Sequence, residues 1–114
     1  MTAAELANKI GAEPINEPAP NREVTCGYTG DLLSRVMGRA EADCVWVTIM
    51  SNVNVVAVAS LADVSAVVFA EDVRPDQAAM DAAKEHGINL YASSKPAFEL
   101  CAEIQGLIDR KSVV

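Results

Sequence analysis

Residues 44–70 read CVWVTIMSNVNVVAVASLADVSAVVFA, and this stretch decides the fold. Its two ends, 44–50 and 64–70, are short apolar runs rich in Val, which is typical of strands buried on both faces of a parallel sheet. Two neighbouring parallel strands need a crossover between them, and a crossover is usually a helix. The segment 55–61 lies between the runs, so we expect a helix there with Asn54 as its N-cap.

The same stretch raises the question of a membrane span. Residues 44–62 are nineteen positions without a charged side chain, close to the length that crosses a bilayer. Their centre, however, carries the polar side chains Ser51, Asn52 and Asn54, as a turn between a strand and a helix would. We therefore expect a buried sheet core and no membrane partner.

The flanking segments continue the alternation of strands and helices. Thr2 and Glu5 form a capping-box pattern that predicts a helix ending before Gly11, and a connector with three prolines follows. The other expected elements are a strand at 22–26, a tight turn at 27–30, a helix at 31–40, a helix at 75–86 with Pro75 at its first position, a strand at 88–92, and a helix capped by Ser94 that runs to 108.

This order predicts an α/β fold: a three-layer domain with a mainly parallel sheet of about four to five strands flanked by helices. A chain of 114 residues has room for one core, so we expect a single domain over 1–114. Within it, 1–21 is the N-terminal helix and Pro-rich connector, and 109–114 is a frayed tail.

The composition excludes several classes of protein. With 19 Ala and 14 Val the chain is too apolar to be intrinsically disordered. Its net charge of −7 argues against nucleic-acid binding, which requires a basic surface. The N-terminus shows no basic segment followed by an apolar run, as a secretory signal would, so we expect a cytoplasmic protein.

The sequence shows no catalytic or metal-binding signature. It contains no GxxxxGK[ST] phosphate loop and no GxGxxG, GxSxG or HExxH motif, so we expect no enzyme activity and no cofactor. Cys26, Cys44 and Cys101 form no CxxC pair, and we expect them to be reduced thiols. His86 is expected to interact with the last carbonyls of its helix, before Gly87. Cys26 precedes a predicted glycine turn and helix start, which leaves a redox role open.

Polar clusters follow each expected strand of the parallel sheet. The carboxyl ends of parallel strands meet at one edge, where ligand crevices form and helix N-termini present free N–H groups to anions. We therefore predict a site for a small anionic or nucleotide-like ligand, built from Thr29, Gly30, Asp31, Ser51, Asn52, Asn54, Ser93 and Ser94. Because these residue types are also preferred helix caps, a purely structural role is the alternative.

Several stretches together resemble the DRTGG-domain family. They are TCGYTGDLLS at 25–34, WVTI at 46–49, NVVAVASL at 54–61, VVF at 67–69 and AKEHGI at 83–88. The resemblance covers residues 2–108 and extends to the N-terminal domain of HPr kinase/phosphorylase. It implies a three-layer α/β fold and association into dimers. The turn GYTGD at 27–31 departs from the five letters of the family name.

The resemblance implies no kinase activity, because the phosphate loop of that kinase belongs to a separate C-terminal domain. We predict a non-catalytic regulatory or accessory module that forms a homodimer and binds a small anionic ligand. Two alternatives stay open: a phosphoryl-transfer enzyme related to HPr kinase, and a protein-interaction subunit of a redox complex associated with hydrogenase.

Overall fold

The computed structural model describes the backbone of residues 1–112 and the side chains of residues 1–108. The elements in chain order are α1 (Ala3–Ile10), β1 (Glu13–Asn16), β2 (Cys26–Thr29), α2 (Leu33–Arg39), β3 (Cys44–Thr48), α3 (Val53–Ala62), β4 (Ala66–Phe69), α4 (Gln77–His86), β5 (Leu90–Ala92) and α5 (Ala97–Ser112). The five strands form one sheet in the order β1-β5-β4-β3-β2. β2 to β5 run parallel, and only β1 pairs antiparallel, with β5. The predicted fold class is confirmed.

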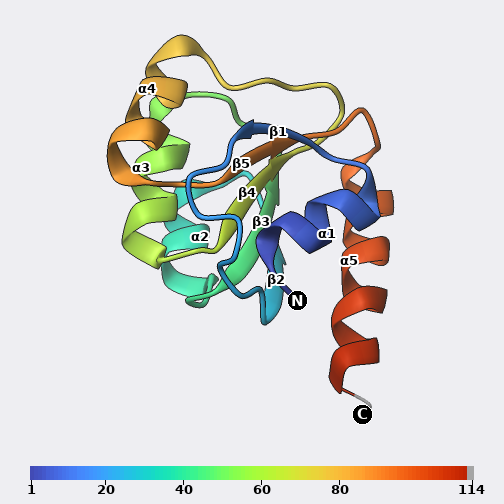
Figure 1. Ribbon diagram of the computed structural model, residues 1–114. Coiled ribbons are helices and arrows are strands. Elements are labelled where there is room, and N and C mark those ends of the chain that lie inside the picture. Colours follow the sequence, from blue (N-terminus) through green and yellow to red (C-terminus); the bar gives the residue numbers. More distant parts are fainter. Residues whose placement is uncertain (113–114) are drawn as a thin grey trace.

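Helices cover both faces of the sheet (Figure 1). On one face α2, α3 and α4 pack side by side over a core that includes Trp46, Val67 and Phe69. On the other face α1 and α5 pack over Val45, Val47 and Tyr91. Every side chain of β3 and β4 is buried, which explains their uninterrupted apolar sequence and confirms both as central strands.

The N-terminal helix forms as its sequence predicts, and the first part of the connector after it pairs as β1. Thr2 and Glu5 make the reciprocal bonds of a capping box at the start of α1, and Gly11 ends the helix with a φ of 70°. The connector that follows is held by buried Asn89, which exchanges hydrogen bonds with the backbone of Ala19. Farther on, Arg22 bonds Asp43 and Asp63, and so joins the connector to the turns before β3 and β4.

The predicted position of the second strand is wrong. We expected a strand at 22–26 and a tight turn at 27–30, but β2 begins at Cys26 and extends to Thr29. Four successive pairs with β3 satisfy the backbone of this segment, so pairing outweighs the turn tendency of its glycines. Gly27 faces α5, where a Cβ atom would lie 3.6 Å from the side chain of Ile104.

Four predicted helix starts are also wrong, and the first is that of α2, which begins at Leu33 rather than at Asp31. Asn52, not Asn54, caps α3, because its Oδ1 atom accepts the N–H of Asn54 at 2.9 Å. Asp76 caps α4, which leaves Pro75 outside the helix. α5 begins at Ala97, three residues after Ser94, and its backbone is helical to Ser112, while fraying of the tail from 109 stays a prediction. The rest of the predicted tail, 113–114, lies outside the described residues.

The uncharged stretch that resembled a membrane span is not one continuous helix. The uncharged stretch 44–62 is divided between β3 and α3. Among the helices within residues 1–112, none combines the length and the apolar character that crossing a membrane requires.

Candidate functional site

The predicted ligand residues lie at or just after the carboxyl ends of β2, β3 and β5: Thr29 ends β2, Asn54 lies in the first turn of α3, and the others stand in the loops. Because these strands are parallel, the loops share the carboxyl edge of the sheet. β2 and β3 are neighbours, whereas β4 separates β3 from β5. The eight residues therefore fall into two groups: Thr29, Gly30, Asp31, Ser51, Asn52 and Asn54 at one end of the edge, and Ser93 and Ser94 at the other.

Asp31 joins the loops after β2 and β3. Its Oδ1 atom accepts the hydroxyl proton of Thr48 at 2.7 Å and the backbone N–H of Ile49 at 2.9 Å. The indole N–H of buried Trp46 donates to the carbonyl of Gly30 at 3.0 Å in the same loop. These bonds fix the loop against β3, and they occupy one oxygen of the carboxylate.

Other predicted ligand residues also make local hydrogen bonds. The Thr29 hydroxyl donates to the carbonyl of Val47 at 3.0 Å. The side chain of Asn52 caps α3, and the Ser93 hydroxyl oxygen accepts the N–H of Lys95 at 3.1 Å. The structural alternative therefore accounts for these three groups, and their role in binding stays a prediction.

The loop after β4 separates the two groups. Glu71 donates its N–H to the carbonyl of Lys95, and Asp72 donates its own to the carbonyl of Ser93. On the other side, the N–H of Asp76 bonds the carbonyl of Ser51. Two exposed carboxylates, those of Glu71 and Asp72, therefore stand between the groups, where they disfavour an anion that would bridge them.

A polar hollow of about 240 Å³ lies beside the second group. It is lined by Gly11, Glu13, Asp72, Arg74, Ala92, Ser93 and Ser94. Arg74 contributes a cation to this hollow and forms an ion pair with Glu13 of β1. Because about half of each side chain stays exposed to water, the pair is open to competition from a dissolved anion.

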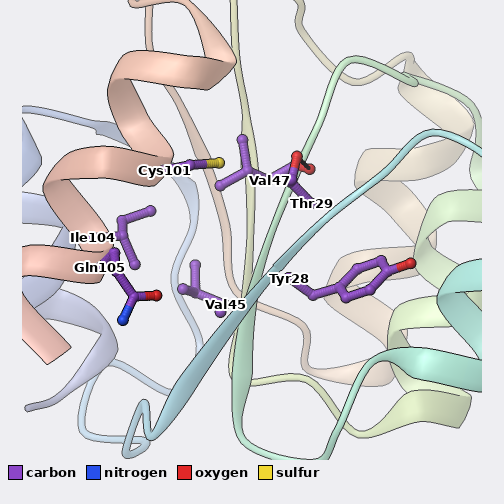
Figure 2. A pocket seen from close by; sticks show the side chains of 8 residues that line it. Tyr28, Thr29, Val45, Val47, Cys101, Ile104 and Gln105 are labelled. Atoms are coloured by element: carbon purple, nitrogen blue, oxygen red, sulfur yellow. Dashed lines mark hydrogen bonds between the residues drawn. The ribbon is translucent and has the colours of Figure 1, made fainter. Parts of the chain in front are cut away.

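A second pocket, of about 170 Å³, lies between α5 and the sheet (Figure 2). Cys101, Ile104 and Gln105 of α5 face Val45 and Val47 of β3 across it, while the Tyr28 ring points away toward the other face of the sheet. The floor is aliphatic, and the hydroxyl of Thr29 at its rim already bonds Val47. This pocket suits an apolar group better than an anionic one.

Two other features of chemical interest were not predicted. Arg74 stands in a polar cluster after β4, so the sequence could have marked it as a candidate ligand residue. Its partner Glu13 comes from β1, and only the antiparallel pairing of β1 with β5 brings the two side chains near each other.

Cys44 lies opposite Cys26 in the register of β2 and β3. Burial, with the neighbouring Cys26 thiol, raises the pKa of Cys44 from 9.0 to about 12. The glycine turn expected after Cys26 is strand, so its thiol does not face a helix start.

Comparison with known proteins supports the fold. No protein-family model matches the chain, and no curated protein matches it either. Among solved structures, it is similar to the CBS and DRTGG domains of the regulatory region of a Clostridium perfringens pyrophosphatase, complexed with the activator diadenosine tetraphosphate. The TM-score is 0.75 at 11% identity, over 90% of this chain and 45% of that one.

This likeness shows a fold shared with that regulatory region. The chain spans less than half the length of the pyrophosphatase fragment, which holds two kinds of domain. The shared fold agrees with the predicted resemblance to the DRTGG-domain family, and membership of that family stays a prediction. The relation to HPr kinase/phosphorylase stays a prediction.

Proposed function

We propose that this domain is a non-catalytic regulatory or accessory module that forms a homodimer and binds a small anionic or nucleotide-like ligand. The observation that carries the proposal is the similarity of its fold, over 90% of the chain, to a regulatory region complexed with a dinucleotide activator. The hydrogen bonds of Thr29, Asn52 and Ser93 hold the loops of this edge in fixed positions.

The polar hollow at Ser93, Ser94 and Arg74 is the best place for the anionic group. Arginine matches the geometry of phosphate oxygens, and the serine hydroxyls add further donors. At about 240 Å³ the hollow is smaller than most drug-sized pockets, which are about 300–1,000 Å³. It therefore suits one phosphate group of a larger molecule. Such a group has to displace the Glu13 carboxylate from Arg74 and to bind beside Asp72, a second acidic residue that lines the hollow.

Calorimetric titration with diadenosine tetraphosphate and with ATP tests this site. We expect Arg74→Gln to weaken binding about 10- to 150-fold, because a charge-assisted hydrogen bond contributes about 1.5–3 kcal/mol. We expect Glu13→Gln to strengthen binding, since it removes the carboxylate that competes for Arg74.

Arg39→Gln is the matched control. Arg39 is exposed in the last turn of α2, at the opposite end of that helix from the carboxyl edge, so its loss removes the same charge without touching the hollow. If Arg74→Gln and Arg39→Gln weakened nucleotide binding equally, the effect would come from the net charge of the chain and not from the hollow. Absence of binding by the folded wild-type chain to either nucleotide would reject the ligand part of the proposal.

The homodimer is proposed because the surface keeps large apolar side chains in contact with water. Leu32 is 62% exposed and lies with the exposed Ile49 and Val53 at the carboxyl edge, whereas Leu61, 73% exposed, lies in the last turn of α3. Phe98, at the start of α5, is 87% exposed. Exposed apolar side chains favour association where they form one contiguous patch. Light scattering at micromolar concentration should give twice the chain mass of 12.0 kDa. A mass of one chain would reject the homodimer.

A further inference from the structure

Cys26 and Cys44 face each other on neighbouring strands. They form the first residue pair between parallel β2 and β3, which lie side by side in the sheet (Figure 1). Both side chains pack in the core under α2, α3 and α4. Neighbouring strands are about 4.8 Å apart, and this spacing falls within the range of Cα separations that a disulfide spans.

The two thiols differ in access to solvent. Cys44 is 1% exposed, whereas Cys26 is partly exposed at the start of the edge strand. The Sγ atom of Cys26 lies 3.9 Å from the carbonyl oxygen of Ala42. A reagent in solution therefore reaches Cys26 first, with Cys44 directly behind it.

The third cysteine is separate from this pair. Cys101 belongs to α5 and packs against the core on the opposite face of the sheet. Figure 2 shows its sulfur pointing into the pocket between α5 and β3. The sheet thus lies between Cys101 and the other two thiols.

We propose that Cys26 and Cys44 are an oxidisable dithiol at which a low-molecular-weight disulfide introduces an intrachain cross-link between β2 and β3. The Cys26 thiolate attacks one sulfur of the small disulfide, whose other sulfur leaves as a thiolate, and a mixed disulfide remains on Cys26. Cys44 then gives its proton to water, and its thiolate attacks Sγ of Cys26 and expels the second small thiolate. Two protein thiols are oxidised, and one small disulfide is reduced to two thiols.

The pKa of Cys44 sets the pace of the second step. Burial raises this pKa, so little Cys44 thiolate is present at neutral pH and the mixed disulfide on Cys26 accumulates before the cross-link closes. Closure then accelerates about tenfold for each pH unit, in proportion to the thiolate fraction of Cys44.

The cross-link would restrain a defined part of the molecule. The loop from Cys26 to Cys44 contains α2 and the Asp31 turn at the carboxyl edge. Slower amide hydrogen exchange is therefore expected between residues 27 and 43 after oxidation, with little change in α4 and α5.

Oxidation of the Cys101→Ser chain with oxidised glutathione tests the proposal, with circular dichroism to verify the fold. After alkylation of remaining thiols, mass spectrometry should find a chain lighter by two hydrogens, without alkyl groups, and a peptide that joins Cys26 to Cys44. A dithiol reductant should restore both thiols. A glutathione adduct that persists on Cys26 at pH 9, or cross-links only between chains, would overturn the proposal.

Two variants assign the steps. Cys26→Ser should block glutathione addition and cross-linking together, whereas Cys44→Ala should allow addition at Cys26 and prevent closure. Should Cys44→Ala unfold, the pH dependence of closure in the Cys101→Ser chain gives the same information. A closure rate that does not change between pH 7 and pH 9 would contradict attack by Cys44.

Discussion

Glu71 holds a backbone conformation that its side chain disfavours. Its φ is 59°, in the left-handed region, and its N–H is bonded to the carbonyl of Lys95. That conformation costs an L-residue about 1–2 kcal/mol, a cost that glycine does not have. Glycine also gains freedom in the unfolded chain, which lowers the stability by about 0.5–1 kcal/mol and so offsets part of the gain. We expect Glu71→Gly to raise the free energy of unfolding by about 0.5–1 kcal/mol, measured by urea denaturation.

Glu85→Gly is the matched control for that substitution. Glu85 is exposed within α4, where the backbone is helical and glycine costs about 1 kcal/mol relative to good helix formers. The two changes remove the same side chain and should move stability in opposite directions. A loss of stability in both would mean that the side chain of Glu71 contributes more than its backbone strain costs.

For single residues, the sequence predicts the position in the candidate site but not the hydrogen bonds. Hydrophobic periodicity places a polar residue in a loop, and the parallel topology then places that loop at the carboxyl edge. What the side chain bonds there depends on distances of a few ångströms, which the pattern does not encode. Asp31 is an example, because its bonds to Thr48 and Ile49 exist only once β2 and β3 are in register.

At the scale of elements, long apolar segments were predictable and short amphipathic ones were not. β3 and β4 are buried on both faces, so their sequences are almost continuously apolar and indicate a buried strand along their whole length. β2 is an edge strand with alternating exposure and two nearby glycines, and its local signals favour a turn. Pairing with β3 overrides those signals, and pairing is a long-range effect.

That misplaced strand also concealed the cysteine pair. A strand at 22–26 puts Cys26 at its carboxyl end, whereas Cys44 opens the next strand, so the two thiols would lie at opposite ends of a parallel pair. With β2 starting at Cys26, both residues open their strands and become register partners. Moving the start of this one strand by four residues thus decides whether the two thiols are neighbours.

At the scale of the whole molecule, the two helical layers bury acidic groups in their neutral forms. Burial raises the pKa of Cys44 to about 12, and burial together with the Glu17 carboxylate, which accepts the hydroxyl proton of Tyr91 at 2.6 Å, raises the pKa of Tyr91. These groups belong to opposite faces of the sheet. Both cores therefore become less stable at alkaline pH for the same reason.

The sign of this effect follows from proton release. Above pH 9 the unfolded chain loses the Cys44 proton while the folded chain keeps it, so unfolding releases a proton and becomes easier as pH rises. The loss is up to about 1.4 kcal/mol per pH unit until the folded pKa is reached. Tyr91 adds to it above about pH 10, where tyrosine ionises in the unfolded chain.

We therefore expect the free energy of unfolding, measured by urea denaturation under reducing conditions, to fall steeply between pH 9 and pH 11. Cys44→Ala should make this fall shallower from pH 9 upward, and Tyr91→Phe should do so only above about pH 10. Cys101→Ser retains both buried groups and should keep the full slope. If Cys44→Ala and the wild-type chain lost stability in parallel over this range, the thiol would have to ionise equally in the folded and unfolded chains, and a buried neutral Cys44 would be ruled out.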